Sequence, residues 1–489
     1  MMDPHFGALL AMVGIVIIVS SLLSGAVERS GFPEVAVFLL VGLVLGPAGL
    51  DLIDFGLASP TLRAIATLAL LFVLFSDAVG ADTGEMRLHR RLAALILGPG
   101  TLLPAALIAV AAWAILGLSP AMAAILGAAL ASTDPVLLGT LLRRPELPAP
   151  ARLGLRLESG MNDAILLPIV VLAILAIGGG GSGAADRQVM QHVVGLFLLG
   201  PALGALTGYV AITILDQVRR RVGVRRDYES LYALGVALTA YAVAESVGGS
   251  GFLAAFFAGI VIAWLDVELC DCFRDYGAAS AEMFLLLTFV AFGTGLIWTG
   301  LSLVGDWRVL LFAVVALLLR TAVLLPVLRR SEVDRRSRMI ISLFGPRGLS
   351  SLLLVLLAVF AGVPGAEQLF VITCLVVLLS VVVHGGGIAV YLQRAARTAG
   401  AAGATAAPVP PAAGQPHAGE VPERVTIEEF QQLRRAGEPV VLADVRTERS
   451  YRDDPDIAAG AIRLLPDDAV RLARERRLDQ HATLVLYCT

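Results

Sequence analysis

Long, nearly uncharged apolar runs recur from residue 7 to residue 391, and no other feature limits the possible folds of this chain as strongly. A run of about 17–25 apolar residues is long enough to cross the hydrocarbon core of a bilayer as a helix. Only 16% of the 489 residues are charged, against about a quarter in soluble domains. The sequence therefore predicts an all-α polytopic membrane protein. Its thirteen expected spans are 7–27, 33–50, 61–80, 92–117, 120–141, 155–178, 190–215, 228–247, 250–266, 278–300, 307–329, 338–361 and 366–391.

Arginine is distributed unevenly among the loops between these spans. Loops after even-numbered spans contain only Arg63, Arg187 and Arg308. Because basic loops stay cytoplasmic, the pattern predicts an odd number of spans in the cell (inner) membrane, with the N-terminus outside and the C-terminus inside. The arginines after odd-numbered spans are Arg29, Arg87, Arg90, Arg91, Arg143, Arg144, Arg152, Arg156, Arg219, Arg220, Arg221, Arg225, Arg226, Arg274, Arg329, Arg330, Arg335, Arg336 and Arg338.

The composition changes after the last apolar run. Residues 1–393 form the expected membrane domain, and residues 394–422 are rich in Ala, Gly, Pro and Thr, which is typical of a flexible linker. Residues 423–489 regain the composition of a soluble domain. The chain lacks a basic stripe with interleaved aromatic residues, so we expect no nucleic-acid partner.

Ionisable residues inside the spans are the first candidates for function, because a charge in the membrane is costly unless it faces a cavity or a partner. Asp134 and Asp163 lie on consecutive antiparallel spans, each about 10–14 Å from the cytoplasmic face at 1.5 Å per residue. Two carboxylates at one depth favour a cation site over a purely structural pair. The full set is Asp77, Asp134, Glu158, Asp163, Glu245, Glu282, Arg320 and Arg347, in which Glu282 is interpreted as an interfacial charge.

Helix-breaking residues adjoin two of these charges. Pro135 follows Asp134 in the fifth span, and Arg347 lies within Gly345-Pro346-Arg347-Gly348 in the twelfth. Interrupted helices at corresponding positions indicate a transporter site built from inverted repeats. Spans 1–6 and 8–13 would then be two inverted six-helix repeats, joined by the seventh span, with broken and crossed helices 5 and 12.

Four motifs now carry a family resemblance: ASTDPV (131–136), ESGMND (158–163), GGSGFLAAFFAG (248–259) and FGPRGL (344–349). In this order and at this spacing they resemble the sodium/proton exchangers, the monovalent cation:proton antiporter superfamily, over about residues 7–393. The resemblance implies a thirteen-helix bundle of inverted repeats, usually a homodimer. Asn162-Asp163 is similar to the dipeptide of the electroneutral class, which exchanges one cation for one proton.

The resemblance also implies a cation site on the fifth and sixth spans. Asp163 would bind cation and proton in turn, and Thr133 and Ser159 would add oxygen ligands. Asp134 would pair with Asn162 and shape the site.

Four further residues have implied supporting roles. Glu158 and Arg347 would form an ion pair that holds the sixth span against the twelfth. Asp77, where many relatives have Glu, would lie near the cation, and Arg320 would be a second structural cation.

The sequence thus predicts a secondary transporter rather than an enzyme, with Na⁺, Li⁺ or K⁺ and H⁺ as substrates and no cofactor. A passive channel would need a repeated carbonyl filter or a ring of acids, and neither is present in the sequence. A membrane-anchored sulfurtransferase or ligand sensor is the alternative, suggested by the tail.

The tail resembles a rhodanese-like domain. A strand at 440–444 leads into Asp444 and Arg446, and a second strand ends at Tyr487-Cys488. In that family a cysteine after such a strand carries persulfide sulfur, and backbone N–H groups stabilise its thiolate. The given sequence ends one residue after Cys488, so we expect an incomplete, non-catalytic domain, either truncated or degenerate and regulatory.

Overall fold

The chain falls into two compact units, Met1–Ala402 and Gly403–Thr489, in a computed structural model. The structure describes residues 7, 10, 12–22, 34–81, 83–142, 144, 147–178, 190–222, 226–265 and 271–391 of the first unit, and residues 430, 433–435, 439–446, 457–464, 472, 476, 478 and 482–487 of the second. The predicted linker, residues 394–422, lies outside the described residues.

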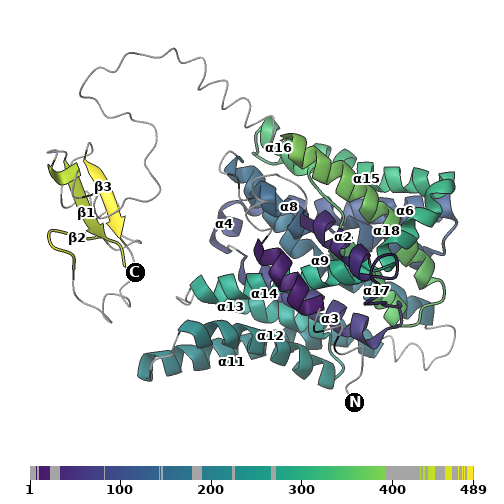
Figure 1. Cartoon of the computed structure of the whole chain (residues 1–489), viewed down its shortest axis with the longest axis horizontal. Helices are drawn as coiled ribbons and strands as arrows, with labels where there is room; N and C mark the ends of the chain where they lie inside the picture. The colour runs from purple at the N-terminus through teal and green to yellow at the C-terminus, as the bar shows by residue number, and fades with distance from the viewer. Residues whose placement is uncertain are drawn as a thin grey trace, which may run out of the picture. The chain divides into compact units, whose positions relative to one another are not determined.

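The first unit is a bundle of helices (Figure 1). Its elements are a helix at Met12–Leu22, α2 (Glu34–Leu45), α3 (Pro60–Val79), α4 (Thr83–Leu88), α5 (Arg90–Leu97), α6 (Pro99–Leu116), α7 (Pro120–Ala131), α8 (Pro135–Leu142), α9 (Ala149–Gly178), the π-helical turn η1 (Gly195–Leu199), α11 (Gly200–Arg221), α12 (Arg226–Ser246), α13 (Gly251–Trp264), α14 (Asp271–Gly293), the 3₁₀ segment η2 (Leu296–Gly305), α15 (Trp307–Val327), η3 (Leu328–Arg330), α16 (Arg335–Leu343), α17 (Leu349–Phe360), α18 (Ala366–Ser380) and the π-helical turn η4 (Val381–Gly385).

Several of these helices are long and apolar enough to cross a membrane, which confirms a multi-pass membrane protein. Within the described residues seven qualify, or eight if a pair bent by 52° at Ala279–Gly293 and Leu296–Gly305 is one span. Five shorter apolar helices overlap the remaining predicted spans. The total of thirteen spans therefore stays a prediction.

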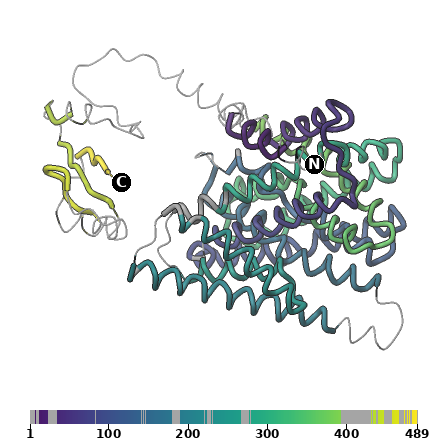
Figure 2. Tube along the Cα trace, turned by 60° about the horizontal axis from the view of Figure 1, so that its bottom comes forward, coloured from purple at the N-terminus to yellow at the C-terminus, as the bar shows by residue number. Residues whose placement is uncertain are grey.

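Small residues bring some helices into close contact. α11, α12 and α13 pack side by side along one edge of the first unit (Figure 1, Figure 2). A Cβ added to Gly204 or Gly208 of α11 would overlap the carbonyl oxygens of Ala254 or Ala258 of α13. Membrane helices use small residues in this way because close approach of the backbones gains packing contacts that lipid cannot provide.

The second unit contains a three-stranded parallel sheet in the order β2-β1-β3. Its strands are β1 (Val440–Asp444), β2 (Ile462–Arg463) and β3 (Thr483–Tyr487). β1 and the end of β3 lie where the sequence predicts strands. A parallel sheet alone does not establish a rhodanese-like fold, so that resemblance stays a prediction.

Candidate functional site

Two helices are interrupted inside the first unit, and their breaks touch. α7 ends at Ala131 and α8 begins at Pro135, while α16 ends at Leu343 and α17 begins at Leu349. The backbone N–H of Asp134 donates to the carbonyl of Pro346 over 2.9 Å. The broken helices 5 and 12 that the sequence predicts therefore meet, and we call their meeting point, residues 132–134 and 344–348, the crossing.

The carboxylate of Asp134 caps the first turns of both half-helices that begin at the crossing. Oδ1 accepts from the N–H groups of Val136 (2.8 Å) and Leu137 (3.4 Å) of α8. Oδ2 accepts from the N–H of Leu349 of α17 over 2.6 Å. These N–H groups have no partner within their own helices, and helix N-termini carry partial positive charge. The Asp134 carboxylate thus links the two breaks through hydrogen bonds to both half-helices.

Two glycines make this close approach possible. A Cβ at Gly348 would overlap the Asp134 carboxylate, and a Cβ at Gly345 would overlap the Arg320 guanidinium. Both positions lie in the motif FGPRGL. The glycines are therefore required by the packing of charged groups against the backbone of the break.

Arg347 binds carbonyl oxygens at the C-terminal end of α7. Its Nη1 donates to the carbonyls of Ala131 (2.9 Å) and Ser132 (3.0 Å), which the end of α7 leaves without helical partners. Its backbone N–H donates to Ser380 Oγ over 2.6 Å, and Ser380 Oγ also lies 3.0 Å from His384 Nδ1. A buried cation thus meets the negative end of a half-helix.

Asp163 of α9 faces the crossing from the adjacent helix. Its Oδ1 accepts a hydrogen bond from Ser132 Oγ, and the carboxylate also interacts with the hydroxyl of Ser350. Its Oδ2 is buried and makes no hydrogen bond within the described part of the chain. The neighbouring Asn162 donates from Nδ2 to Thr133 Oγ1 over 2.9 Å. The hydroxyls of Ser132 and Ser350 thus contact the Asp163 carboxylate, and its buried Oδ2 remains able to bind a ligand.

Asp77 of α3 lies beside the part of α9 that contains Asp163. A Cβ at Gly160, less than one turn before Asp163 in α9, would lie 3.4 Å from the Asp77 Cγ. Asp77 also interacts electrostatically with Asp163 and Asp134. Ser159, four residues before Asp163 and on the same helix face, donates to the Leu155 carbonyl over 2.9 Å.

The predicted pairing of Glu158 with Arg347 is wrong. Glu158 is held by Arg320 of α15, with both oxygens 2.6 Å from guanidinium nitrogens. Arg320 also donates to the carbonyls of Ile341 and Ser342 at the end of α16, each over 2.8 Å. The planar guanidinium fits a bidentate carboxylate, whereas Arg347 is occupied by the carbonyls of α7.

The predicted pairing of Asp134 with Asn162 is wrong as well. Both Asp134 oxygens accept from backbone N–H groups, and Asn162 bonds to Thr133 instead. The sequence reasoning also missed Ser132 and Ser350 as neighbours of Asp163. Ser132 lies inside ASTDPV and Ser350 directly follows FGPRGL, so both serines adjoin the breaks, and that position is the signal that could have found them.

In the second unit, Asp444 and Arg446 form a buried pair. Arg446 Nη2 donates to Asp444 Oδ2 over 2.8 Å and Nε donates to Oδ1 over 2.9 Å. These hydrogen bonds from Arg446 hold the pKa of Asp444 below its usual range. The pair stabilises the end of β1. Cys488 lies outside the described residues, so the structure does not test a sulfur-transfer site.

Comparison with known proteins agrees with this geometry. The family described as sodium/hydrogen exchanger, transmembrane, matches residues 15–394. The K(+)/H(+) antiporter NhaP of Alkalimonas amylolytica is 28% identical over 387 residues, covering 77% of this chain and 65% of that protein. The Na(+)/H(+) antiporter 2 of Zygosaccharomyces rouxii is 26% identical, covering 78% of this chain and 52% of that protein.

A solved structure shares the fold. The sodium proton antiporter MjNhaP1 from Methanocaldococcus jannaschii, determined at pH 8, matches with a TM-score of 0.63 at 18% identity over 79% of this chain and 99% of that chain. The chain spans 65% of the length of the NhaP relative from Alkalimonas. The family match covers the helices that form the crossing and most of the sequence. The chain therefore belongs to the transmembrane sodium/hydrogen exchanger family.

Proposed function

We propose that this protein exchanges a monovalent cation, Na⁺, Li⁺ or K⁺, for protons across the cell membrane, with Asp163 as the shared binding group. The observation that carries the proposal is the buried Oδ2 of Asp163, which no described residue hydrogen-bonds. An unpaired charge buried in a membrane protein is costly. A bound proton or a bound cation removes that cost, and one carboxylate cannot hold both at full occupancy.

The other charged side chains around the crossing each have a partner among the described residues. Glu158 is neutralised by Arg320, Arg347 faces the carbonyls of α7, and the Asp134 carboxylate faces two helix N-termini. Within the described residues, no ion pair reaches Asp163 or Asp77. We therefore propose Asp163, whose Oδ2 makes no hydrogen bond within the described residues, as the group whose charge changes when a substrate binds, with Asp77 as its neighbour.

Hard cations prefer oxygen ligands, and the hydroxyls of Ser132 and Ser350 contact Asp163. Thr133, whose Oγ1 accepts from the neighbouring Asn162, belongs to the proposed ligand set as well. Ser159 and Asp77 belong to the proposed ligand set from the same helix face and the adjacent helix. If the transporter changes the side to which the site opens only when the site is occupied, exchange of cation for proton becomes obligatory. Asn162 does not titrate, so the proposed ratio is one proton per cation.

The names of the relatives support a monovalent cation as substrate. The Alkalimonas relative is named for potassium, whereas the Zygosaccharomyces relative and the archaeal structure are named for sodium. We therefore propose the class of monovalent alkali cations, with selectivity set by the distances among the same oxygens. An external N-terminus, a cytoplasmic C-terminus and a homodimer complete the proposal.

The proposal is tested in everted membrane vesicles that hold a preformed pH gradient. Addition of Na⁺, Li⁺ or K⁺ should dissipate the gradient in vesicles with the wild-type protein. Asp163→Asn keeps the shape of the side chain but removes its charge, so it should abolish the response. Glu332→Gln, which makes the same chemical change on an exposed side chain, should leave it intact.

The same vesicles test the stoichiometry. Because one positive charge replaces another, the rate of a 1:1 exchange should not respond to an imposed membrane potential. Full transport by Asp163→Asn would refute the role of this carboxylate. A rate that rises with the potential would refute the 1:1 ratio alone.

A further inference from the structure

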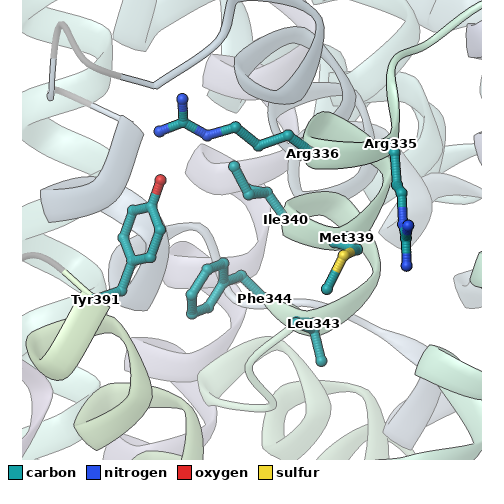
Figure 3. A pocket seen from close by; sticks show the side chains of 7 residues that line it. All are labelled: Arg335, Arg336, Met339, Ile340, Leu343, Phe344 and Tyr391. Carbon is teal, nitrogen blue, oxygen red and sulfur yellow. The ribbon is translucent and has the colours of Figure 1, made fainter. Parts of the chain in front are cut away.

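A groove with a volume of about 520 Å³ runs along α16, the short helix that leads into the crossing (Figure 3). Arg335 and Arg336 lie at the start of α16; the Arg336 side chain extends toward Tyr391, and the Arg335 side chain extends along the other side of the helix (Figure 3). Leu343 and Phe344 lie at the other end, and Tyr391 forms the opposite wall. The Phe344 and Tyr391 rings are in edge contact, with centroids 5.5 Å apart.

The lining residues form two parallel rows along the helix. One row is Arg335, Met339 and Leu343, and the other is Arg336, Ile340 and Phe344. Residues four apart lie on the same face of a helix. Each row therefore begins with a guanidinium and continues with apolar side chains. Such a groove matches a ligand with an anionic end and a long apolar end.

The apolar part of the groove is open to its surroundings. Met339 is 45% exposed and Leu343 is 47% exposed. On the surface of a membrane protein, exposed side chains of this kind contact acyl chains. Tyrosine is enriched where the hydrocarbon core meets the headgroups, and Tyr391 provides one wall of the groove.

The charged end of the groove is suited to a phosphate. Arginine binds phosphate oxygens with two parallel N–H donors. Two acidic residues precede the arginines. The carboxylate of Asp334 already caps α16 by accepting from the Ser337 N–H over 3.1 Å, and Glu332 lies 4.0 Å from Arg91.

We propose that this groove binds one anionic phospholipid of the surrounding membrane, with the headgroup at Arg335 and Arg336 and an acyl chain along the two apolar rows. Phe344 is the first residue of the break that contains Arg347. A bound lipid would therefore stabilise the end of α16 where it enters the crossing. That effect on transport rests on the proposed function, whereas binding of the lipid does not.

Native mass spectrometry of the full chain in detergent tests the binding. The protein is titrated with phosphatidylglycerol and with phosphatidylcholine of the same acyl chains. The wild-type protein should retain phosphatidylglycerol preferentially. Arg335→Gln with Arg336→Gln should weaken phosphatidylglycerol binding by about tenfold or more, since each basic residue near an anionic headgroup adds to the affinity.

Two further variants control for charge and folding. Arg329→Gln with Arg330→Gln removes the same charge from exposed residues of η3 that do not line the groove, and it should leave the preference unchanged. Met339→Trp narrows the apolar part and keeps both arginines, so it should also weaken binding. Equal retention of the two lipids, or equal losses in the two double-arginine variants, would overturn the proposal.

Discussion

At the scale of single residues, two buried arginines near the crossing stabilise different negative groups. Arg320 is paired with the full charge of Glu158 and also binds the last carbonyls of α16. Arg347 has no carboxylate within ion-pair distance among the described residues and binds carbonyls at the end of α7. Because a buried ion pair is costly to break from one side only, the two arginines should respond differently to the loss of Glu158.

A double-mutant cycle measures this difference. Glu158→Gln or Arg320→Met alone leaves one buried charge without its partner, which should cost about 3–5 kcal/mol. The combination Glu158→Gln/Arg320→Met should recover a large part of that loss, because neither charge is then left alone. Apparent melting temperatures of the detergent-solubilised protein provide the measurement.

The matched control is Glu158→Gln/Arg347→Met. Its two changes should show less recovery of the melting temperature than Glu158→Gln/Arg320→Met, because the side chains do not form the direct pair. Greater recovery in this combination than in Glu158→Gln/Arg320→Met would contradict the pairing in the structure.

The candidate residues could be found from the sequence, but not all of their partners. Asp163, Asp134 and both arginines were identifiable because a charged side chain inside an apolar span is costly unless it faces a cavity or a partner. Partner choice depends on how each helix is rotated about its axis and how deep it sits. Arg320 lies in a uniformly apolar segment of α15 without a break or motif, so nothing local indicates that it faces Glu158.

At the scale of elements, the crossing is held together by backbone contacts that leave little space. Asp134 caps α8 and α17 together, and Gly348 lies directly against its carboxylate. A side chain at position 348 has no free volume to occupy. The relative position of the two broken helices therefore depends on the absence of a single methyl group.

Gly348→Ala should destabilise the protein by about 1–3 kcal/mol or more, the usual cost of overpacking. It should also reduce cation-dependent dissipation of a pH gradient, since Asp134 must move. Gly139→Ala in α8 is the matched control, because a Cβ there meets nothing within 4 Å. Thermal unfolding and vesicle transport should show a loss for the first variant and none for the second. Similar behaviour of the two would contradict the tight packing described here.

Both helix breaks were predictable from the sequence because proline has a fixed local effect. Pro135 and Pro346 lack the N–H that an uninterrupted helix would need. The mutual contact of the breaks was expected from the repeat pattern, but the capping of two helices by Asp134 was not. That capping depends on a distance between segments that are more than 200 residues apart in the sequence.

At the scale of the whole molecule, the family match and the shared fold place residues 15–394 in a transmembrane exchanger domain. Hydropathy predicts the positions of the apolar helices, because the length of a span is set by the bilayer. The tail was less predictable, because short strands depend on contacts between distant segments. β2, only two residues long, has no recognisable signal of its own.

The central claim is that cation and proton share Asp163, and the most direct test counts protons released when a cation binds. Purified protein in weakly buffered detergent solution receives Na⁺, Li⁺ or K⁺ while a pH indicator records the change. The wild-type protein should release protons in proportion to the cation bound, and Asp163→Asn should release none. Undiminished proton release by Asp163→Asn, or cation binding by the wild-type protein without any release at any pH, would contradict a shared site at Asp163.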